Sequence, residues 1–206
     1  MSDLVRGLVL REVGAPPALE ELELMSPQRG EVRVAIRAVG VCHSDLSVAS
    51  GVLPQPVPCV LGHEASGVVT AVGEGVSRWS LGDRVIVQWV PMCRTCASCM
   101  RGEPWLCTTY LKVACRMDDG TTRFRRAGEE FAHALNAGAF ADEIVVRETG
   151  LAALPDDVPF EIGALIGCGL LTGWGAVANV ATVQPDEHVA VFGAGGVGLD
   201  LSLIHI

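Results

Sequence analysis

The sequence has no excess of basic residues, because 15 Lys and Arg stand against 24 Asp and Glu and give a formal net charge of −9. Proteins that hold the phosphates of nucleic acid need a basic face, so we expect no nucleic-acid partner. Internal repeats and low-complexity linkers are also absent. Half of the residues are hydrophobic and 24 are Gly, which indicates a compact core with many turns and argues against disorder.

Two kinds of apolar segment are missing as well. The first residues, MSDLVRGLVL, have no charged stretch followed by a long apolar one, so we expect no secretory signal. No run of about 18 apolar residues occurs, so we expect no membrane span. Eight cysteines without a signal are more readily explained as metal ligands or free thiols than as disulfides. The predicted location is therefore cytoplasmic.

Strands are predicted in the first half of the chain, where segments are rich in β-branched residues or alternate in polarity. These segments are residues 5–13, 31–39, 66–73 and 83–90. Residues 115–131 are polar and charged, and we expect a surface excursion there, followed by another strand in FADEIVV. Residues 155–181 have the pattern of helical segments.

Residues 92–107 are rich in Cys and poor in aliphatic side chains, so they cannot form an apolar core of their own. The pattern is C-x2-C-x2-C-x7-C, formed by Cys93, Cys96, Cys99 and Cys107. Four thiolates on a tight loop suit tetrahedral zinc and leave no position for water, so the predicted site is structural. The alternatives are four buried thiols, two disulfides, or iron in a rubredoxin-like site.

A second set of possible metal ligands is dispersed along the chain. Cys42 lies in GVCHSD, His63 in LGHE and Cys168 in IGCG. Three protein ligands leave one zinc position open for a substrate oxygen. Each residue alone also has an ordinary structural explanation, since a lone Cys is commonly a small buried apolar residue. The residues by themselves leave both explanations open.

A glycine-rich turn follows the apolar segment His188–Phe192, which we predict to be a strand. Gly193, Gly195 and Gly198 form G-x-G-x-x-G, in which the glycines permit a tight turn and close approach to a pyrophosphate. The following helix would offer free N–H groups to the phosphates. The pattern therefore predicts a dinucleotide cofactor, and its usual acidic ribose ligand would come about 20 residues later.

Together these motifs resemble the medium-chain, zinc-dependent alcohol dehydrogenases. GVCHSD, LGHEASGVV, the four cysteines, IGCGLLTGWGA and VFGAGGVG occur in the order of that family. The resemblance implies a β-rich GroES-like catalytic domain over residues 1–170, with a structural-zinc lobe at 92–107. Residues 171–200 would then start a truncated α/β Rossmann domain. Residues 201–206, LSLIHI, resemble a translated sequencing adapter and are expected to be a non-native tail, with a native helix as the alternative.

The activity implied by the resemblance is hydride transfer between a zinc-bound alcohol, or an aldehyde in reverse, and NAD, with NADP not excluded. Cys42, His63 and Cys168 would hold the catalytic zinc, and the four lobe cysteines a second, structural Zn2+. The implied partners are a small alcohol or aldehyde and further copies of the full-length chain, with no nucleic acid and no membrane. The 206-residue chain by itself is expected to be inactive.

The resemblance also implies further site residues. Ser44 would bond the substrate hydroxyl and start a proton relay, while Asp45 and Glu64 would orient the ligands or stabilise the zinc. Trp89 would line the substrate pocket. The implied cofactor-binding residues are His43, Thr172, Gly193, Gly195, Gly196 and Gly198.

Two positions depart from the family pattern. Glutathione-dependent formaldehyde dehydrogenases share the MDDGTTRF insertion but carry an Arg where this sequence has Leu111, which weakens the case for a glutathione adduct. Ser47 stands where relatives commonly have a relay His, so the outer end of the relay is undefined. Formaldehyde dehydrogenase, a related aldehyde reductase working in reverse, and a catalytically dead zinc-binding fragment are the alternative functions.

Overall fold

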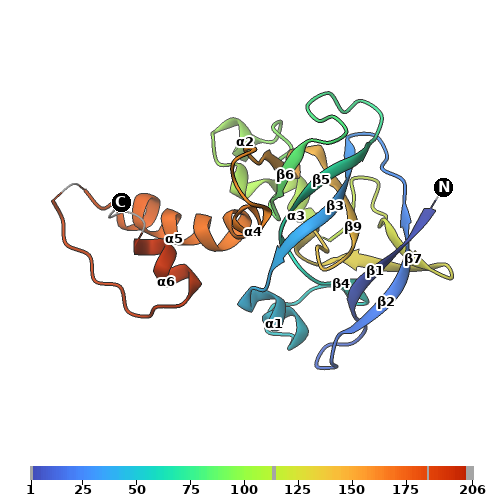
Figure 1. The fold of residues 1–206 in the computed structure, drawn as a ribbon, viewed down its shortest axis with the longest axis horizontal. Helices are drawn as coiled ribbons and strands as arrows, with labels where there is room; N and C mark the ends of the chain where they lie inside the picture. Colours follow the sequence, from blue (N-terminus) through green and yellow to red (C-terminus); the bar gives the residue numbers. More distant parts are fainter. Residues whose placement is uncertain (1, 113–114, 185, 203–206) are drawn as a thin grey trace.

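Strands occur up to residue 153 and form a β-rich body, from which helices extend to one side (Figure 1). The computed structural model describes residues 2–112, 115–184 and 186–202. The body combines a closed barrel with a five-stranded sheet. The predicted β-rich class is therefore confirmed.

The barrel closes in the order β1-β2-β7-β8-β4. Its strands are β1 (Ser2–Leu10), β2 (Ala18–Met25), β4 (Cys59–Val60), β7 (Phe124–Arg126) and β8 (Glu129–His133). In β2, Leu22 and Leu24 are buried while Glu21 and Glu23 are more exposed, the alternation of a strand with one face in the core. β1 ends earlier than predicted because a turn follows it, with the Ala15 N–H donating to the Glu12 carbonyl.

The second sheet has the order β10-β6-β5-β3-β9, and all its neighbouring strands are antiparallel. Its strands are β3 (Glu31–Gly40), β5 (Glu64–Val72), β6 (Arg84–Val87), β9 (Glu143–Arg147) and β10 (Leu151–Ala153). The register pairs Gly40 with Glu64 and Ala65 with Val87. The residues that follow β3, precede β5 and follow β6 therefore leave the sheet at the same end.

Short helices cover the connections between strands. They are α1 (His43–Ala49), α2 (Ala97–Met100), η1 (Pro104–Leu106), α3 (Thr108–Lys112), η2 (Ala134–Asn136) and η3 (Glu148–Gly150). The longest helical segment leaves the body after β10 (Figure 1). Its consecutive parts are α4 (Phe160–Leu165), η4 (Ile166–Leu170), α5 (Leu171–Gly175) and η5 (Ala176–Ala181), with π-helical hydrogen bonding in η4 and η5.

Glycines let this segment approach the sheet closely. A Cβ on Gly167 would lie 2.6 Å from the Val87 carbonyl oxygen, and one on Gly163 would lie 2.9 Å from the Leu154 side chain. Real Cβ atoms do not come that near to backbone, so only Gly fits at residue 167. The contact fixes the neighbouring Cys168 against the end of β6. The predicted domain boundary at residue 170 falls inside this unbroken segment and stays a prediction.

By length and composition alone, the helical segment Phe160–Ala181 could cross a membrane, since it has 22 residues and a mean hydropathy of 1.5 in its most apolar window. One such helix is weak evidence of a span, because core helices of soluble proteins pass the same test. α6 (Gly196–Leu201) folds back onto this segment (Figure 1), where Asp200 packs on Gly173.

The prediction of a surface excursion at residues 115–131 is wrong for its second half. Phe124 and Phe131 are fully buried in the core, and they belong to barrel strands β7 and β8. Arg123 is also buried, and its guanidinium donates to the Glu31 carboxylate at 2.5 and 2.7 Å. Pairing with an acidic partner offsets much of the cost of burying a charge, so a polar sequence can line an interior.

The predicted strand at His188–Phe192 is also wrong. Residues 187–194 have no regular secondary structure, and the Phe192 side chain is 98% exposed. No described strand lies alongside to pair with its N–H and C=O groups, and an unpaired strand gains nothing from being extended. Of the suspected tail 201–206, residues 203–206 lie outside the described part of the chain, and the tail prediction stands untested.

Candidate metal centres and substrate pocket

Two groups of potential metal ligands converge in the described residues. In each group the ligand atoms all lie within 4.8 Å of one another. The first, called here the mixed group, comprises Cys42, His63, Glu64 and Cys168. The second, the cysteine lobe, comprises Cys93, Cys96, Cys99 and Cys107. The structure thus brings together both sets that the sequence predicted, and it adds Glu64 to the first.

The mixed group is assembled by the sheet register and by one helix. Cys42 follows β3 and His63 precedes β5, and the pairing of Gly40 with Glu64 brings both to one edge. Cys168 arrives from the remote η4, held by the contact of Gly167 with the end of β6. Residues 126 positions apart therefore meet through packing alone.

Asp45 is buried behind the mixed group and holds two of its members. One carboxylate oxygen accepts hydrogen bonds from the Gly62 N–H and from His63 Nδ1, both at 3.2 Å. The other oxygen accepts from the Cys42 N–H at 3.2 Å. With Nδ1 bound to the carboxylate, His63 keeps the lone pair of Nε2 for a metal.

Glu64 was predicted to assist the metal ligands, and its carboxylate oxygen lies among them. It is 4% exposed, and Gly40 makes room for it, since a Cβ there would meet the carboxylate at 2.3 Å. Burial, and then the charges of Cys42 and Glu64, raise the pKa of Cys168 to about 12. A cation among these atoms would stabilise the thiolate of Cys168 and so lower its pKa. This donor set therefore fits a soft divalent metal such as zinc.

In the cysteine lobe, short loops wrap the thiols around one point. Cys93 Sγ lies 3.9 Å from Cys99 Sγ, and it accepts a hydrogen bond from the Cys96 N–H at 3.2 Å. Cys107 Sγ accepts from the Cys93 N–H at 3.4 Å. Arg94 has a φ of 61°, which turns the chain tightly between the first two cysteines.

Hydrogen bonds prepare two of these thiols for ligation. Those from Thr109 and Thr95 lower the pKa of Cys93 to about 5, and the Cys99 N–H lowers that of Cys96 to about 7. Desolvation raises the pKa of Cys99 to about 11. Because the thiolate is the ligating form, the four-thiol arrangement fits a closed tetrahedral zinc site.

A cavity of about 280 Å³ opens onto the mixed group. It is lined by Ser44, Leu53, Gln55, His63, Trp89, Cys115, Leu135, Asn136 and Cys168. The predicted pocket residue Trp89 does line it, and its ring meets the His63 ring edge-on at 6.3 Å. Ser44 Oγ lies 3.6 Å from Cys42 Sγ. Gln55, Cys115, Leu135 and Asn136 were not predicted, because they come from separate segments without a shared motif.

The outer end of the predicted relay is defined only in part. Ser47 Oγ lies 3.4 Å from His43 Nδ1 on the exposed side of α1. Among the described residues no hydrogen bond joins Ser44 to either of them. The serine at position 47 is therefore placed to contact His43 and is not connected to Ser44 through the protein.

The predicted cofactor residues are only partly brought into a site. Gly193 has a φ of 109°, and a Cβ on Gly198 would lie 2.0 Å from the Gly193 carbonyl oxygen, so the tight turn requires both glycines. Gly195 caps α6 and Gly196 begins it. This turn fits a phosphate-binding loop, although the strand expected before it is missing. Thr172 is exposed on α5.

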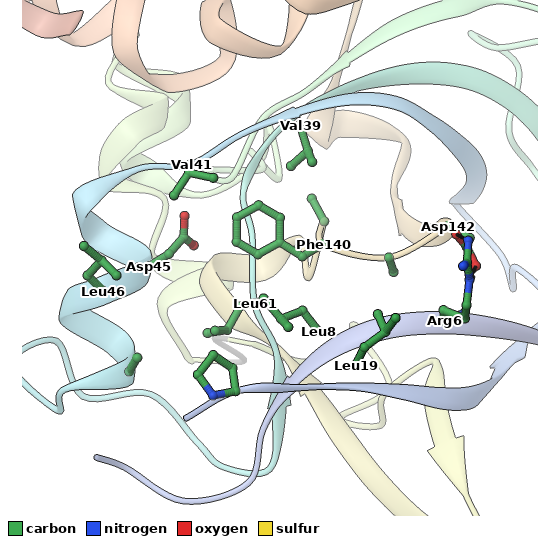
Figure 2. A pocket seen from close by; sticks show the side chains of 14 residues that line it. Arg6, Leu8, Leu19, Val39, Val41, Asp45, Leu46, Leu61, Phe140 and Asp142 are labelled. Carbon is green, nitrogen blue, oxygen red and sulfur yellow. Dashed lines mark hydrogen bonds and ion pairs between the residues drawn. The ribbon is translucent and has the colours of Figure 1, made fainter. Parts of the chain in front are cut away.

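A larger hollow of about 610 Å³ lies between α1, β1, the end of β3 and residues 139–142 (Figure 2). Its lining is mostly apolar. The Arg6–Asp142 ion pair, at 2.9 Å, and Asp45 lie on opposite sides of it in Figure 2. Arg6 and Asp142 neutralise each other, and Asp45 is already engaged by Cys42, Gly62 and His63. The hollow therefore offers no free reactive group.

The structure defines a class of protein: a β-rich domain with a Cys-His-Cys donor group beside a cavity and a separate four-cysteine lobe. Residues 28–156 match the alcohol dehydrogenase GroES-like domain family, which is more than half of the chain. The chain belongs to that family.

Similar proteins agree with this assignment. An S-(hydroxymethyl)glutathione dehydrogenase of Synechocystis is 43% identical over 94% of the chain, and a class-3 alcohol dehydrogenase of Dictyostelium discoideum is 38% identical over 96%. An alcohol dehydrogenase zinc-binding domain protein from Burkholderia ambifaria has a solved structure that is 36% identical, with a TM-score of 0.90 over 97% of this chain and 55% of that one. The chain spans about half the length of the curated relatives, 53% in both cases.

Proposed function

We propose that this chain is the metal-binding part of a zinc-dependent alcohol dehydrogenase, an oxidoreductase that moves a hydride between an alcohol and NAD or NADP. The observation that carries the proposal is the convergence of Cys42, His63 and Cys168 beside a cavity, with Asp45 holding two of them. An S-, N- and O-donor set at a cavity is typical of a catalytic centre, whereas the all-thiol cysteine lobe is typical of a structural one.

Cys42, His63 and Cys168 would hold the catalytic zinc, with Glu64 as a further donor, and the cysteine lobe would hold the structural zinc. A zinc ion at the mixed group supplies Lewis-acid polarisation of the substrate oxygen. Two zinc ions per subunit are therefore part of the proposal.

The protein groups around the cavity have distinct tasks in this reaction. Ser44 lines the cavity next to Cys42, so its hydroxyl can take the proton that the alcohol loses while it releases its own proton to water. The same exchange runs backwards in the reverse reaction. Trp89 packs against His63 and helps to exclude water from the reacting atoms. Asp45 keeps His63 in one tautomer and one orientation.

The glycine turn at residues 193–198 supports the cofactor part of the proposal, because its backbone is free of side chains where a pyrophosphate would approach. His43 and Thr172 are proposed to contact the cofactor as well. We further propose a cytoplasmic location, a small alcohol or aldehyde as substrate, and association of full-length chains with one another, without nucleic-acid or membrane partners.

The test is Cys168→Ala in a full-length version of the protein. We expect turnover of primary alcohols, followed by nicotinamide absorbance, to disappear, while zinc content falls from two ions to one. Cys59→Ala is the matched control, since Cys59 is a buried cysteine outside both donor groups. Activity that survives in the Cys168 variant would contradict the assignment of this residue to the reacting metal.

A further inference from the structure

The cavity beside the mixed group has a second polar region, made of residues that take no part in metal binding. It is called here the amide wall, and it comprises Gln55, Cys115, Leu135 and Asn136. The wall joins the loop after α1, the segment before β7 and the turn η2. Three segments remote in sequence are thus held together beside the metal donors.

The backbone of the amide wall is unusual. Cys115, Leu135 and Asn136 have φ values of 66°, 51° and 60°, in the left-handed region that non-glycine residues seldom adopt. These are three of seven such residues in the described chain. Backbone of this kind is strained and persists where surrounding contacts enforce it, commonly at ligand sites.

Two side-chain amides enforce this backbone. Gln55 Oε1 accepts a hydrogen bond from the Leu135 N–H at 3.2 Å and another from the Cys115 thiol at 2.6 Å. Asn136 Oδ1 accepts from the Cys115 N–H at 2.8 Å. Both amide oxygens therefore face protein donors, and this fixes which end of each amide is nitrogen.

The nitrogen ends retain capacity to bind. Gln55 Nε2 donates to the Pro54 carbonyl at 3.1 Å and Asn136 Nδ2 to the Trp89 carbonyl at 3.1 Å. An amide NH2 carries two hydrogens, and within the described part of the chain each nitrogen has one protein acceptor. Both residues line the cavity, and one N–H donor of each amide has no protein acceptor among the described residues.

The lining of the cavity also indicates that its ligand carries no charge. Among the described residues the only ionisable side chains that line the cavity are His63, Cys115 and Cys168, and no Arg, Lys, Asp or Glu does. A charged substrate would lose hydration there without gaining a partner. At about 280 Å³ the cavity is small, near the lower end of ligand pockets, roughly 300–1,000 Å³.

We propose that Gln55 determines specificity by donating a hydrogen bond to a second, uncharged oxygen of the substrate. The substrate class is then a compact neutral alcohol or aldehyde with an ether, hydroxyl or carbonyl oxygen beyond its reacting carbon. Asn136 supports the wall and offers a second donor. This inference rests on the proposed dehydrogenase function.

The test uses the full-length zinc-loaded protein and isosteric six-atom primary alcohols. 1-Hexanol is compared with 2-propoxyethanol, 3-ethoxypropan-1-ol and 4-methoxybutan-1-ol, in which an oxygen replaces one CH2 at different places. We expect at least one ether to exceed hexanol in kcat/KM by roughly 2- to 10-fold, the worth of one neutral hydrogen bond. S-(hydroxymethyl)glutathione is the charged comparison and is expected to be the poorest substrate.

Gln55→Glu removes the donor of the side chain and keeps its acceptor, so it tests the donor alone. The carboxylate can still accept from Leu135 and Cys115, so the fold and melting temperature should hold, but the donor is gone and the ether preference should disappear. Gln55→Leu should lose the preference and also lower the melting temperature, because the Leu135 N–H loses its acceptor. Gln28→Glu, on an exposed turn, is the matched control and should keep the wild-type ratio.

The outcomes separate the inference from the function it rests on. If the wild-type protein oxidises hexanol and all ethers equally, or if Gln55→Glu keeps the ether preference, the specificity inference is wrong and the dehydrogenase proposal stands. A glutathione adduct that outperforms every neutral alcohol would also overturn it. If no alcohol is oxidised at all, both proposals fail.

Discussion

Asp45 is the residue on which most of the mixed group depends. It is 4% exposed, and its two oxygens accept three hydrogen bonds, from Cys42, Gly62 and His63. Gly62, which also has to be glycine because a Cβ would meet the Phe140 nitrogen at 2.4 Å, brings the third N–H to the carboxylate. A single carboxylate thus fixes both the position of the thiol and the tautomer of the imidazole.

Replacing Asp45 with Asn should therefore weaken the mixed group without touching the cysteine lobe. An amide presents an NH2 where the carboxylate accepted, so one of the three donors loses its partner. Loss of a group that orients a metal ligand costs about 10- to 100-fold in metal affinity. Chelator competition on the full-length protein measures this, with Asp142→Asn, at the exposed Arg6 ion pair, as control. Equal zinc affinity in both variants would show that Asp45 does not act on the metal.

At the scale of elements, the cysteine lobe and the barrel achieve stability in different ways. The lobe has short helices, α2 and η1, and several exposed apolar side chains, including Met100 and Trp105. It cannot bury enough apolar surface to be stable by itself, so its four thiols and a metal would replace a core. The barrel instead buries Phe124 and Phe131, and a buried ion pair joins Arg123, just before β7, to Glu31 of the second sheet.

Cys99→Ala should release the lobe metal. Elemental analysis of the full-length protein should show one zinc ion fewer, and the melting temperature should fall, by roughly 5–15 °C, because metal binding at such a site supplies folding free energy. Ser98→Ala, at the buried residue next to Cys99, is the control and should keep both zinc and stability. An unchanged melting temperature in Cys99→Ala would count against a structural metal in the lobe.

The buried Arg123–Glu31 pair gives a second prediction at this scale. Arg123 is 2% exposed and donates twice to Glu31 and once to Asp119. Arg123→Met should cost about 3–5 kcal/mol in the free energy of unfolding, because it leaves Glu31 charged and unpaired in the interior. Denaturant unfolding measures the change.

Two further variants complete the measurement. Arg123→Met combined with Glu31→Leu should recover most of the loss, since no buried charge remains. Arg125→Met, which breaks a half-exposed pair with Glu130, should cost less than about 1 kcal/mol. If the single Arg123 variant were no worse than the Arg125 variant, the buried pair would not contribute to stability.

At the scale of the whole molecule, the β-rich body has large buried apolar clusters, whereas the C-terminal helices contribute few residues to any core. Trp174 and Val180 of the helical segment are exposed, as is Phe192 beyond it. α6 packs mainly against η4 and α5 of the helical segment (Figure 1). The two metal-donor groups therefore lie in or against the well-packed body, and the glycine turn lies outside it.

Residues 1–206 expressed alone should consequently bind zinc but show no alcohol oxidation. The glycine turn lacks neighbouring strands among the described residues, so a nicotinamide would have no fixed orientation, and alignment of reactants is worth roughly 7–11 kcal/mol of a barrier. The assay follows nicotinamide absorbance with a panel of primary alcohols and zinc by elemental analysis. Clear zinc-dependent turnover by this chain would prove the prediction wrong.

The sequence alone determined the residue types and spacings that chemistry requires. The cysteine lobe could be predicted because its four thiols lie within 15 residues, and short loops allow few other geometries. Cys42, His63 and Cys168 were identified through motifs, and the strands β3, β5 and β9 through alternation and β-branched residues. Each of these features could be predicted because the residues that specify it lie close together in the sequence or belong to a known motif.

Only the tertiary structure decided which remote residues meet. The register of Gly40 with Glu64 brought a fourth donor into the mixed group, and the left-handed turn at η2 placed Asn136 in the cavity beside Gln55. Tertiary contacts also decided that Arg123 is buried and that residues 188–192 do not form a strand. Partners across the fold set these outcomes, because an ion pair makes a charge tolerable in a core and a strand forms only beside another strand.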